Sequence, residues 1–321
     1  MQKKILILVA SLFYLVIPFA DAVENSMTIL MEKFENIENL PVTKLTKNQY
    51  HEIVSALEKK EEKIRFVTYN MLFNLHDYNQ SEENRWPNRL PRIVELISEM
   101  RPDIINTQEL YPNQVQEITS LLENEFSFFP GQKDADGESY GIFYRTDRFE
   151  LLSKQVSYPL SMVQLRDLKT NKIIYVFNTH MPFLNMEKRE SWAHKMAQII
   201  EPFAQQMAVI FSGDLNTFSN RLDLPNLPFY DGDYIHRILS KGALKNSQEL
   251  SLLGHFGPIS TFTNNGKDKE PFQGTGTPGI ILDSIYVSNK VTVLTHVVEK
   301  GTVNGHFPSD HMPVLIDFII Q

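Results

Sequence analysis

From Ile64 to the end of the chain, short apolar runs alternate with stretches of helical periodicity. We predict strands at 64–70, 104–109, 140–144, 149–152, 173–179, 208–212, 280–287, 291–297 and 314–320, and helices at 89–100, 113–122, 189–203 and 234–239. Pro91 would then lie in the first turn of its helix, where proline is tolerated. Because helices separate only some of the strands, the pattern favours a mixed-sheet α/β or α+β domain over a regular parallel barrel.

The first residues have the pattern of a secretory signal peptide. Lys3 and Lys4 precede an apolar run at 5–17, which is followed by Pro18 and a small-x-small site at 20–22. An uncleaved anchor helix is the alternative, but a bilayer span needs roughly 20 apolar residues and this run is shorter. We therefore expect a signal peptide at 1–22, export to the periplasm or the outside, and no membrane span after cleavage.

Residues 23–63 are rich in Glu, Lys and Asn, and this composition differs from that of the residues that follow. Within them, 46–49 has the form of a capping box, and Tyr50, Ile53, Val54 and Leu57 follow at helical spacing. We read this segment as an N-terminal helical extension that precedes one large domain at 64–321, and we expect a monomer.

Composition narrows the class of protein. With 42% apolar residues and no cysteine, the chain is neither disordered nor a disulfide scaffold. Its formal charge of −8 argues against a surface that binds nucleic acid non-specifically. A local basic groove remains open, and the cations available for it are Arg85, Arg89, Arg92, Lys133 and Arg145.

Polar residues gather where apolar strands end, and these places carry the candidate chemistry. They are Tyr69-Asn70, Gln108-Glu109, Asn178-Thr179-His180, Gly213-Asp214-Leu215-Asn216 and Ser309-Asp310-His311, together with Asp283 inside an apolar strand. Taken singly, an Asp or Asn after a strand is usually a cap or turn residue, and a lone His is usually a surface residue. Asp283 fits such a reading least well, because a carboxylate in an apolar strand must be paired or neutralised.

The order of these six features resembles the endonuclease/exonuclease/phosphatase superfamily of metal-dependent phosphoesterases. That superfamily includes pancreatic-type deoxyribonucleases, apurinic endonucleases, inositol-polyphosphate 5-phosphatases and bacterial sphingomyelinases. The resemblance covers about 64–320, and the run at 137–149 looks like its exported bacterial branch. It implies a four-layer sandwich of two packed mixed β-sheets flanked by helices.

The resemblance also implies a metal site. Glu109 would be the best ligand, and Asn70 and Asp310 would complete or support it. Oxygen and amide ligands without cysteine suit a hard cation, so we expect Mg²⁺, with Mn²⁺ as an alternative. Some relatives carry a further acid two residues after the first Asn, and Leu72 stands there in this chain. The number of metal ions, one or two, stays open.

The remaining residues would carry out the reaction. By the same resemblance, Asp214 would orient and deprotonate the attacking water, and Asn216 would donate hydrogen bonds to the phosphate. His180 would donate to the scissile phosphate or act as the acid for the leaving oxygen. His311 would pair with Asp283 and serve either as a phosphate-binding group or as a base.

These expectations describe an exported Mg²⁺-dependent hydrolase of phosphate mono- or diesters. The substrate could be a nucleic acid, a phospholipid or a small phosphoester, so a nuclease, a sphingomyelinase and a phosphoinositide phosphatase all remain open. For a lipid substrate, the loops with Trp86, Phe183-Leu184 or Phe256 could supply an apolar contact. The alternative from another class is a secreted binding or effector protein that keeps the fold without turnover.

Overall fold

The computed structural model describes residues 62–75, 77–122, 125–133, 137–183, 185–217, 233–263, 281–299 and 302–321. The expected signal peptide, residues 1–22, lies outside the described residues. So does the expected extension at 23–63, apart from its last two residues. None of the helices in the described ranges combines the length and the apolar character that a membrane span requires.

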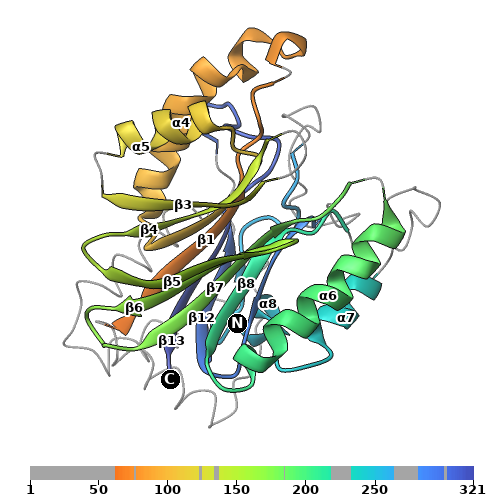
Figure 1. Cartoon of the computed structure of the whole chain (residues 1–321). Helices are drawn as coiled ribbons and strands as arrows, with labels where there is room; N and C mark the ends of the chain where they lie inside the picture. The colour runs from red at the N-terminus through yellow and green to blue at the C-terminus, as the bar shows by residue number, and fades with distance from the viewer. Residues whose placement is uncertain are drawn as a thin grey trace, which may run out of the picture. The chain divides into compact units, whose positions relative to one another are not determined.

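Two β-sheets form the centre of the described domain (Figure 1). One sheet has the strand order β10 (His255–Phe256), β12 (Val291–Val298), β13 (Val314–Ile320), β1 (Ile64–Asn70), β2 (Ile104–Gln108), β4 (Ser139–Arg145) and β3 (Phe126–Lys133). The other has the order β5 (Phe149–Ser157), β6 (Leu160–Asp167), β7 (Ile173–His180), β8 (Ala208–Asp214), β11 (Asp283–Val287) and β9 (Lys245–Asn246). Both sheets mix parallel and antiparallel pairs.

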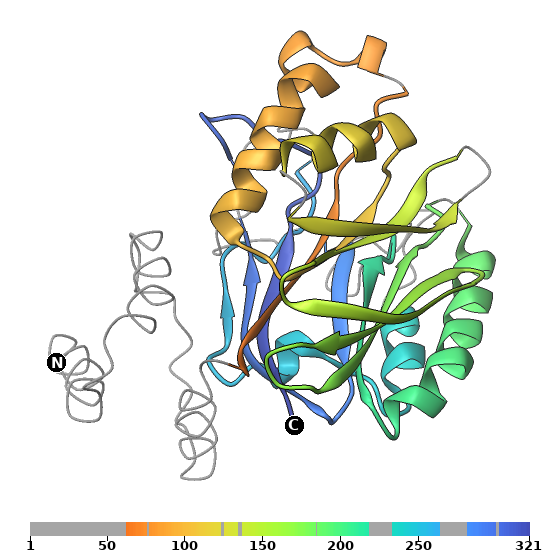
Figure 2. The ribbon, with the colours of Figure 1, turned by 60° about the vertical axis from the view of Figure 1, so that its left-hand side comes forward.

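Helices cover the outer face of each sheet, as the two views show (Figures 1 and 2). The helices α4 (Trp86–Met100) and α5 (Pro112–Leu121) pack on the sheet that contains β1 and β2. On the sheet that contains β7 and β8 lie α6 (Met186–Ala204) and α7 (Tyr234–Ser240). The short elements α8 (Ser247–Leu250), η3 (Asp77–Asn79) and η4 (Glu82–Asn84) complete the described helices. The predicted class, two mixed sheets flanked by helices, is confirmed.

Burial on both faces explains why the central strands are almost continuously apolar. In β1, Phe66 packs between the two sheets, whereas Val67 points to the opposite face and packs under α4 and α5. In β8, Ile210 packs between the sheets and Phe211 packs under α6 and α7. Successive side chains of a strand point to opposite faces, so a strand with two covered faces needs apolar residues at nearly every position.

The strands and helices predicted between 64 and 320 are all found, but four strands were missed: β3, β6 and the two-residue strands β9 and β10. The strand β3 contains Pro130 and Gly131, and its pairing with β4 shifts register between Phe129 and Gln132, so its sequence lacks a regular alternation. The strand β6 was also not predicted. The strand β5 is longer than predicted, since it runs from Phe149 to Ser157 and not only over 149–152.

The predicted start of the helix at 89 is wrong. The helix α4 begins at Trp86 after the extended residue Arg85, with a proline already at its second position, so Pro91 lies inside the helix and not in its first turn. A proline there removes one intrahelical hydrogen bond. Pro91 is exposed to solvent, where water can hydrogen-bond to the unpaired carbonyl.

Candidate active site

Strand pairing places three of the predicted residues in one row across a sheet. The strands β7 and β8 are parallel, and His180 lies opposite Asp214 in their register. The strands β8 and β11 are antiparallel, and Asp214 lies opposite Asp283. The row formed by His180, Asp214 and Asp283 therefore follows directly from the hydrogen-bond register of the sheet.

The other sheet brings a second set of residues to the same edge. The strands β1 and β2 are parallel, so Asn70 at the end of β1 lies beside the end of β2, where Glu109 follows. The strand β13 runs antiparallel to β1, so the loop that precedes it, with Asp310 and His311, returns to this edge. All six sequence features thus reach one end of the sandwich.

Buried amides join the two sheets beneath this edge. Gln108 Nε2 donates to Asn178 Oδ1 at 2.8 Å, and Asn178 Nδ2 donates to the carbonyl oxygens of Thr107 and Gly141. Since Gln108 and Asn178 are fully buried and belong to different sheets, these bonds fix the distance between the sheets at the base of the site.

Asn70 connects the two sides of the site through one amide group. Its Nδ2 donates to Glu109 Oε1 at 2.9 Å and to Asp214 Oδ2 at 3.0 Å. Its Oδ1 accepts a hydrogen bond from the backbone N–H of Leu72 at 3.0 Å, which fixes which end of the amide faces the carboxylates. Asn70 therefore sets the separation between the expected metal ligand and the expected base.

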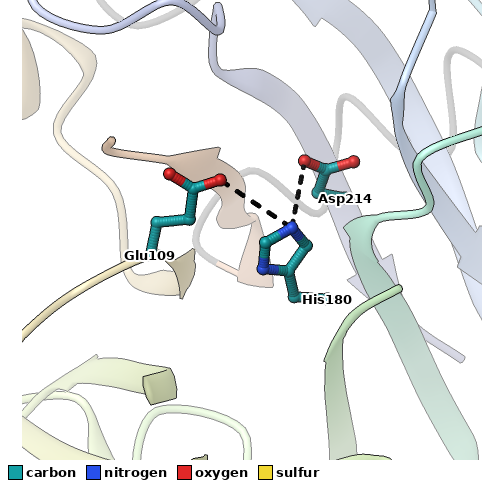
Figure 3. Close-up of side chains that lie close together, drawn as sticks. All are labelled: Glu109, His180 and Asp214. Atoms are coloured by element: carbon teal, nitrogen blue, oxygen red, sulfur yellow. Dashed lines mark ion pairs between the residues drawn. The ribbon is translucent and has the colours of Figure 1, made fainter. Parts of the chain in front are cut away.

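His180 lies between the same two carboxylates (Figure 3). Its Nε2 is 3.8 Å from Glu109 Oε1 and 3.6 Å from Asp214 Oδ2. Asn216 Nδ2 donates to the Met181 carbonyl oxygen at 2.8 Å and lies 3.1 Å from His180 Nε2. Because this Nδ2 is a donor, Nε2 accepts, and the proton of the neutral imidazole is assigned to Nδ1.

His311 and Asp283 form a buried pair on the other side of Asp214. His311 Nδ1 is 2.8 Å from Asp283 Oδ2, and His311 Nε2 is 3.5 Å from Asp214 Oδ2. Burial alone would lower the pKa of His311, but the negative charges of Asp283 and Asp214 outweigh it and raise this pKa well above its ordinary value of 6.5. The imidazolium form is therefore favoured, with Nε2 directed at Asp214.

The site carries an excess of negative charge. Among the described residues, two groups have ligand atoms within 4.8 Å of one another: Glu109, His180 and Asp214, and Asp214, Asp283 and His311. Asp310 belongs to neither group. Burial raises the pKa of the Glu109 carboxyl above its ordinary value, and the nearby charge of Asp310 adds to this. In the described ion pairs, no Lys or Arg neutralises these carboxylates.

This donor set fits a hard divalent cation. Glu109 offers a carboxylate that Asn70 Nδ2 holds in place, and Asp310 adds a second negative charge nearby. A buried carboxylate without a cationic partner is costly, and a bound cation would remove that cost. Leu72 supplies no side-chain ligand: it is buried, and its backbone is held in a left-handed conformation with φ 56°.

Three residues that line the site were not singled out from the sequence. Glu138 Oε2 lies 4.0 Å from His180 Nδ1, on the face of the imidazole away from Asp214. The Tyr140 ring contacts His180 edge-on, and the Phe262 ring contacts His311 in the same way. Glu138 directly precedes β4 and lies two residues before the predicted strand at 140–144, so its place near a strand start was the available signal.

Backbone strain occurs at three positions of the site. Six non-glycine residues in the described ranges have positive φ, and three of them lie at this edge: Leu72, Glu109 and Asn216, with φ values of 56°, 61° and 48°. Such conformations cost of order 1–3 kcal/mol each and persist where the surroundings enforce them. Gly213 lies close to β7, where an added Cβ would be 2.0 Å from the Thr179 carbonyl oxygen. Glycine is therefore required before Asp214.

Four of the five cations considered for a basic groove bond to other protein groups or are buried, and the fifth, Lys133, is exposed. Arg89 is fully buried, Arg85 and Arg92 donate to backbone carbonyl oxygens, and Arg145 pairs with Glu125 and Asp147. Of the aromatic residues considered for contact with lipid, Trp86 is buried and its Nε1 donates to Glu117, so it is not available. Phe183 is half exposed and remains available for such a contact.

Comparisons with known proteins agree with this fold. The chain aligns over 81% of its length, at 21% identity and a TM-score of 0.66, with an endonuclease/exonuclease/phosphatase family protein from Bacteroides thetaiotaomicron, of which 98% is covered. A mannosyl-6-phosphatase from the same organism aligns at 21% identity with a TM-score of 0.65, covering 80% of this chain and 100% of that one. The human Nocturnin catalytic domain aligns at 20% identity with a TM-score of 0.58, covering 81% and 94%. A search of curated proteins gives no match.

At these identities the structural matches establish the fold alone. The sequence profile of the Endonuclease/Exonuclease/phosphatase family, however, matches residues 67–311, which spans every site residue described above. The chain belongs to the endonuclease/exonuclease/phosphatase family.

Proposed function

We propose that the protein is an exported, Mg²⁺-dependent hydrolase of phosphate mono- or diesters. The observation that carries this proposal is the convergence of Glu109, His180, Asp214 and His311 at one end of the sandwich, with their reactive atoms 3.5–3.8 Å apart around Asp214 Oδ2 and His180 Nε2. This arrangement combines a carboxylate for a cation, a carboxylate for a water and two imidazoles for a phosphate.

Glu109 is the primary metal ligand in this proposal. Asp310 supports the cation directly or through water, and Asn70, whose Nδ2 faces the carboxylates, supports it by holding Glu109 Oε1. When bound, Mg²⁺ or Mn²⁺ would neutralise phosphate oxygens and stabilise the charge that develops on the ester oxygens. The excess of carboxylates over Lys and Arg in the described part of the site supports a cation there.

Asp214 orients the attacking water and takes one of its protons. The water oxygen forms a new bond to phosphorus, the bond from phosphorus to the alcohol oxygen breaks, and the alcohol oxygen leaves with a proton. Asp214 Oδ1 already accepts the backbone N–H of Asn216 at 2.9 Å, which leaves Oδ2 facing the cluster. When a bound phosphate replaces the contact between Asn216 Nδ2 and His180 Nε2, Nδ2 donates to the phosphate, and His180, protonated on Nε2, donates to the leaving oxygen.

His311 binds the phosphate as an imidazolium in this proposal. Asp283 holds Nδ1 through the 2.8 Å contact, so Nε2 is left to donate toward the reaction centre. The raised pKa of His311, caused by the surrounding carboxylates, favours a charged donor over a neutral base at ordinary pH.

The proposal names the phosphate ester but not the alcohol, which substrate tests must identify. A structural relative named as a mannosyl-6-phosphatase supports testing sugar phosphates first. Arg89 and Arg145 bond to other protein groups, which leaves fewer cations for the basic groove that a nuclease would need. Phe183 is half exposed three residues after His180, where it could contact a lipid, so lipid substrates are tested as well.

One assay separates these outcomes. The purified protein is incubated with Mg²⁺, Mn²⁺ or EDTA and offered sugar phosphates, a chromogenic phosphodiester, plasmid DNA, RNA, sphingomyelin and phosphoinositides. We expect metal-dependent release of phosphate or alcohol from at least one class, with loss of that activity in Asp214→Ala and His311→Ala. Cleavage that survives either substitution contradicts the site assignment. A folded, metal-binding protein that cleaves none of them supports the non-enzymatic effector alternative.

Export and oligomeric state need separate measurements. We propose that residues 1–22 are removed during export, so mass spectrometry of the protein recovered from outside the cytoplasm should place its N-terminus at Val23. A protein that keeps residues 1–22 and stays with the membrane would support the anchor alternative. Light scattering of the purified protein should give the mass of a monomer.

A further inference from the structure

A fully buried arginine lies behind the metal side of the candidate site. Arg89 Nη1 donates to the carbonyl oxygens of Met71 at 2.8 Å and Pro308 at 3.1 Å, and Nη2 donates to the Leu72 carbonyl oxygen at 2.9 Å. The nearest carboxylate oxygen, in Asp77, is 3.8 Å from Nη2. Burying a guanidinium among neutral carbonyl groups is costly, so a specific task for it is expected.

Arg89 binds the turn at residues 71–73, and the backbone of this turn binds two expected metal-site residues. Leu72 donates its backbone N–H to Asn70 Oδ1 at 3.0 Å, and Phe73 donates its backbone N–H to Glu109 Oε2 at 3.3 Å. The left-handed conformation of Leu72 aims these two N–H groups, and Arg89 fixes the carbonyl groups on the other side of the same peptides. The guanidinium thus acts on Asn70 and Glu109 through the backbone.

The third carbonyl oxygen extends this arrangement to the loop before β13. Pro308 directly precedes Ser309, whose Oγ donates to the Asn70 carbonyl oxygen at 2.8 Å and lies 3.3 Å from Asp310 Oδ1. One planar guanidinium therefore connects the turn after β1 with the loop that carries Asp310, although these two segments are far apart in sequence.

We propose that Arg89 is a positioning residue that sets the metal affinity of the site. It does so by holding Asn70, Glu109 and Asp310 in one arrangement through the backbone carbonyls of residues 71, 72 and 308. This inference rests on the proposed metal-dependent function and adds to it a residue that touches neither metal nor substrate.

Charge and geometry make opposite predictions for Arg89, which allows them to be separated. The positive charge of Arg89 interacts with Glu109 and Asp310, so as a charge alone it would repel a cation. Lysine keeps the charge but cannot reproduce the planar fork of donors, whereas methionine loses both. If charge governs, Arg89→Lys binds metal normally and Arg89→Met binds it more tightly. If the fork governs, both variants bind it more weakly.

A second buried arginine provides a matched control. Arg189 is also fully buried and donates to the Pro182 carbonyl oxygen at 2.9 Å, in the segment that follows His180. It is comparable to Arg89 in burial and bonding, but the segment that it holds carries none of the three metal-side residues. Arg189→Lys should therefore disturb the fold to a similar extent and leave metal affinity alone.

Metal affinity is measured without substrate, by electron paramagnetic resonance of Mn²⁺ titrated into the purified full chain, with Mg²⁺ as competitor. We expect Arg89→Lys and Arg89→Met to bind Mn²⁺ about 10- to 100-fold more weakly than the unaltered protein, the usual effect of losing a group that orients metal ligands. Arg189→Lys should stay within about twofold, because it loses no group that orients these ligands.

The titration also gives outcomes that contradict the proposal. Normal Mn²⁺ binding by Arg89→Lys, or an equal loss in Arg189→Lys, would overturn it. Failure of the unaltered protein to bind Mn²⁺ would instead overturn the proposed metal-dependent function, and the role of Arg89 with it.

If Arg89→Lys does not melt cooperatively, it is not properly folded, and Gln114→Met then tests the proposal in its place. Gln114 Nε2 donates to the same Leu72 carbonyl oxygen at 3.1 Å without any charge. Its loss should weaken Mn²⁺ binding by about 3- to 10-fold, the effect of one neutral hydrogen bond. Unchanged affinity in a folded Gln114→Met protein would contradict the proposal.

Discussion

Replacing Asp283 by asparagine removes one buried charge from the site and keeps nearly the same shape. In the native protein, Asp283 Oδ2 lies 2.8 Å from His311 Nδ1, and both side chains are almost completely buried. An amide oxygen in place of the carboxylate can still accept the Nδ1 proton, so the imidazole should keep its orientation. What changes is the electrostatic stabilisation of the imidazolium.

The size of the effect follows from this contact. A hydrogen bond to a charged group contributes about 1.5–3 kcal/mol, which corresponds to about a 10- to 150-fold change in an equilibrium or rate constant. The pKa of His311 is raised because carboxylates surround it, so its charged form persists above pH 6.5. Removing one of these charges lowers this pKa, and the charged form is then lost at lower pH.

The assay is the dependence of kcat on pH for the native protein and Asp283→Asn, at saturating metal. We expect kcat to fall about 10- to 150-fold at pH 8 and the alkaline limb to move by about one to two pH units toward acid. Asp317→Asn is the control, because Asp317 is a buried carboxylate paired with Arg65 near the start of β1, away from the site. It should lower stability without moving this limb.

Two results would refute the reasoning. An unmoved alkaline limb in Asp283→Asn would mean that this carboxylate does not set the charge of His311. A gain of activity at acidic pH in the same variant would mean that neutral His311, acting as a base, is the active form.

Three further outcomes are expected. Glu109→Gln should weaken Mn²⁺ binding at least about 100-fold in a titration, and undiminished binding would rule Glu109 out as a ligand. EDTA should abolish turnover by the native protein until Mg²⁺ is restored. Phe211→Ala should lower the free energy of unfolding by about 3–5 kcal/mol in urea, whereas half-exposed Phe183→Ala should change it by less than about 0.5 kcal/mol; equal losses would contradict the burial of Phe211. Burial alone would raise the pKa of Asp317, but Arg65 holds it below 3.8, so the pair stabilises the fold above that pH and this contribution is lost as the pH falls further. The melting temperature of Asp317→Asn should therefore fall less steeply in acid, and parallel acid profiles would argue against the pair.

The sequence predicted the main strands and the residues at their ends because both depend on local patterns. Apolar runs of strand length identify β1, β2, β7 and β8, and a polar residue directly after such a run is poorly suited to the core. Asn70, Glu109, His180 and Asp214 all occupy such positions, and the parallel pairing brings them to one edge. Their exact distances depend on register, which the sequence does not state.

What escaped prediction depends on partners that are distant in the chain. Arg89 was considered for a basic groove, yet it is buried because the carbonyl oxygens of Met71, Leu72 and Pro308 accept its hydrogen bonds. Glu138 lies beside His180 because the two sheets pack against each other, which its position before a strand does not reveal. The strand β3 was hidden by the proline and glycine at its irregular pairing with β4, where no simple alternation survives.

The row formed by His180, Asp214 and Asp283 has a consequence for the evolution of such proteins. Because hydrogen-bond register sets the spacing of the three residues, the connections that leave these strand ends can lengthen, shorten or be exchanged without altering it. Loss of a single residue within β8, in contrast, would turn Asp214 to the opposite face of the sheet. New substrates are therefore accessible through inserted or exchanged loops, while the strands tolerate substitution but not a change of length.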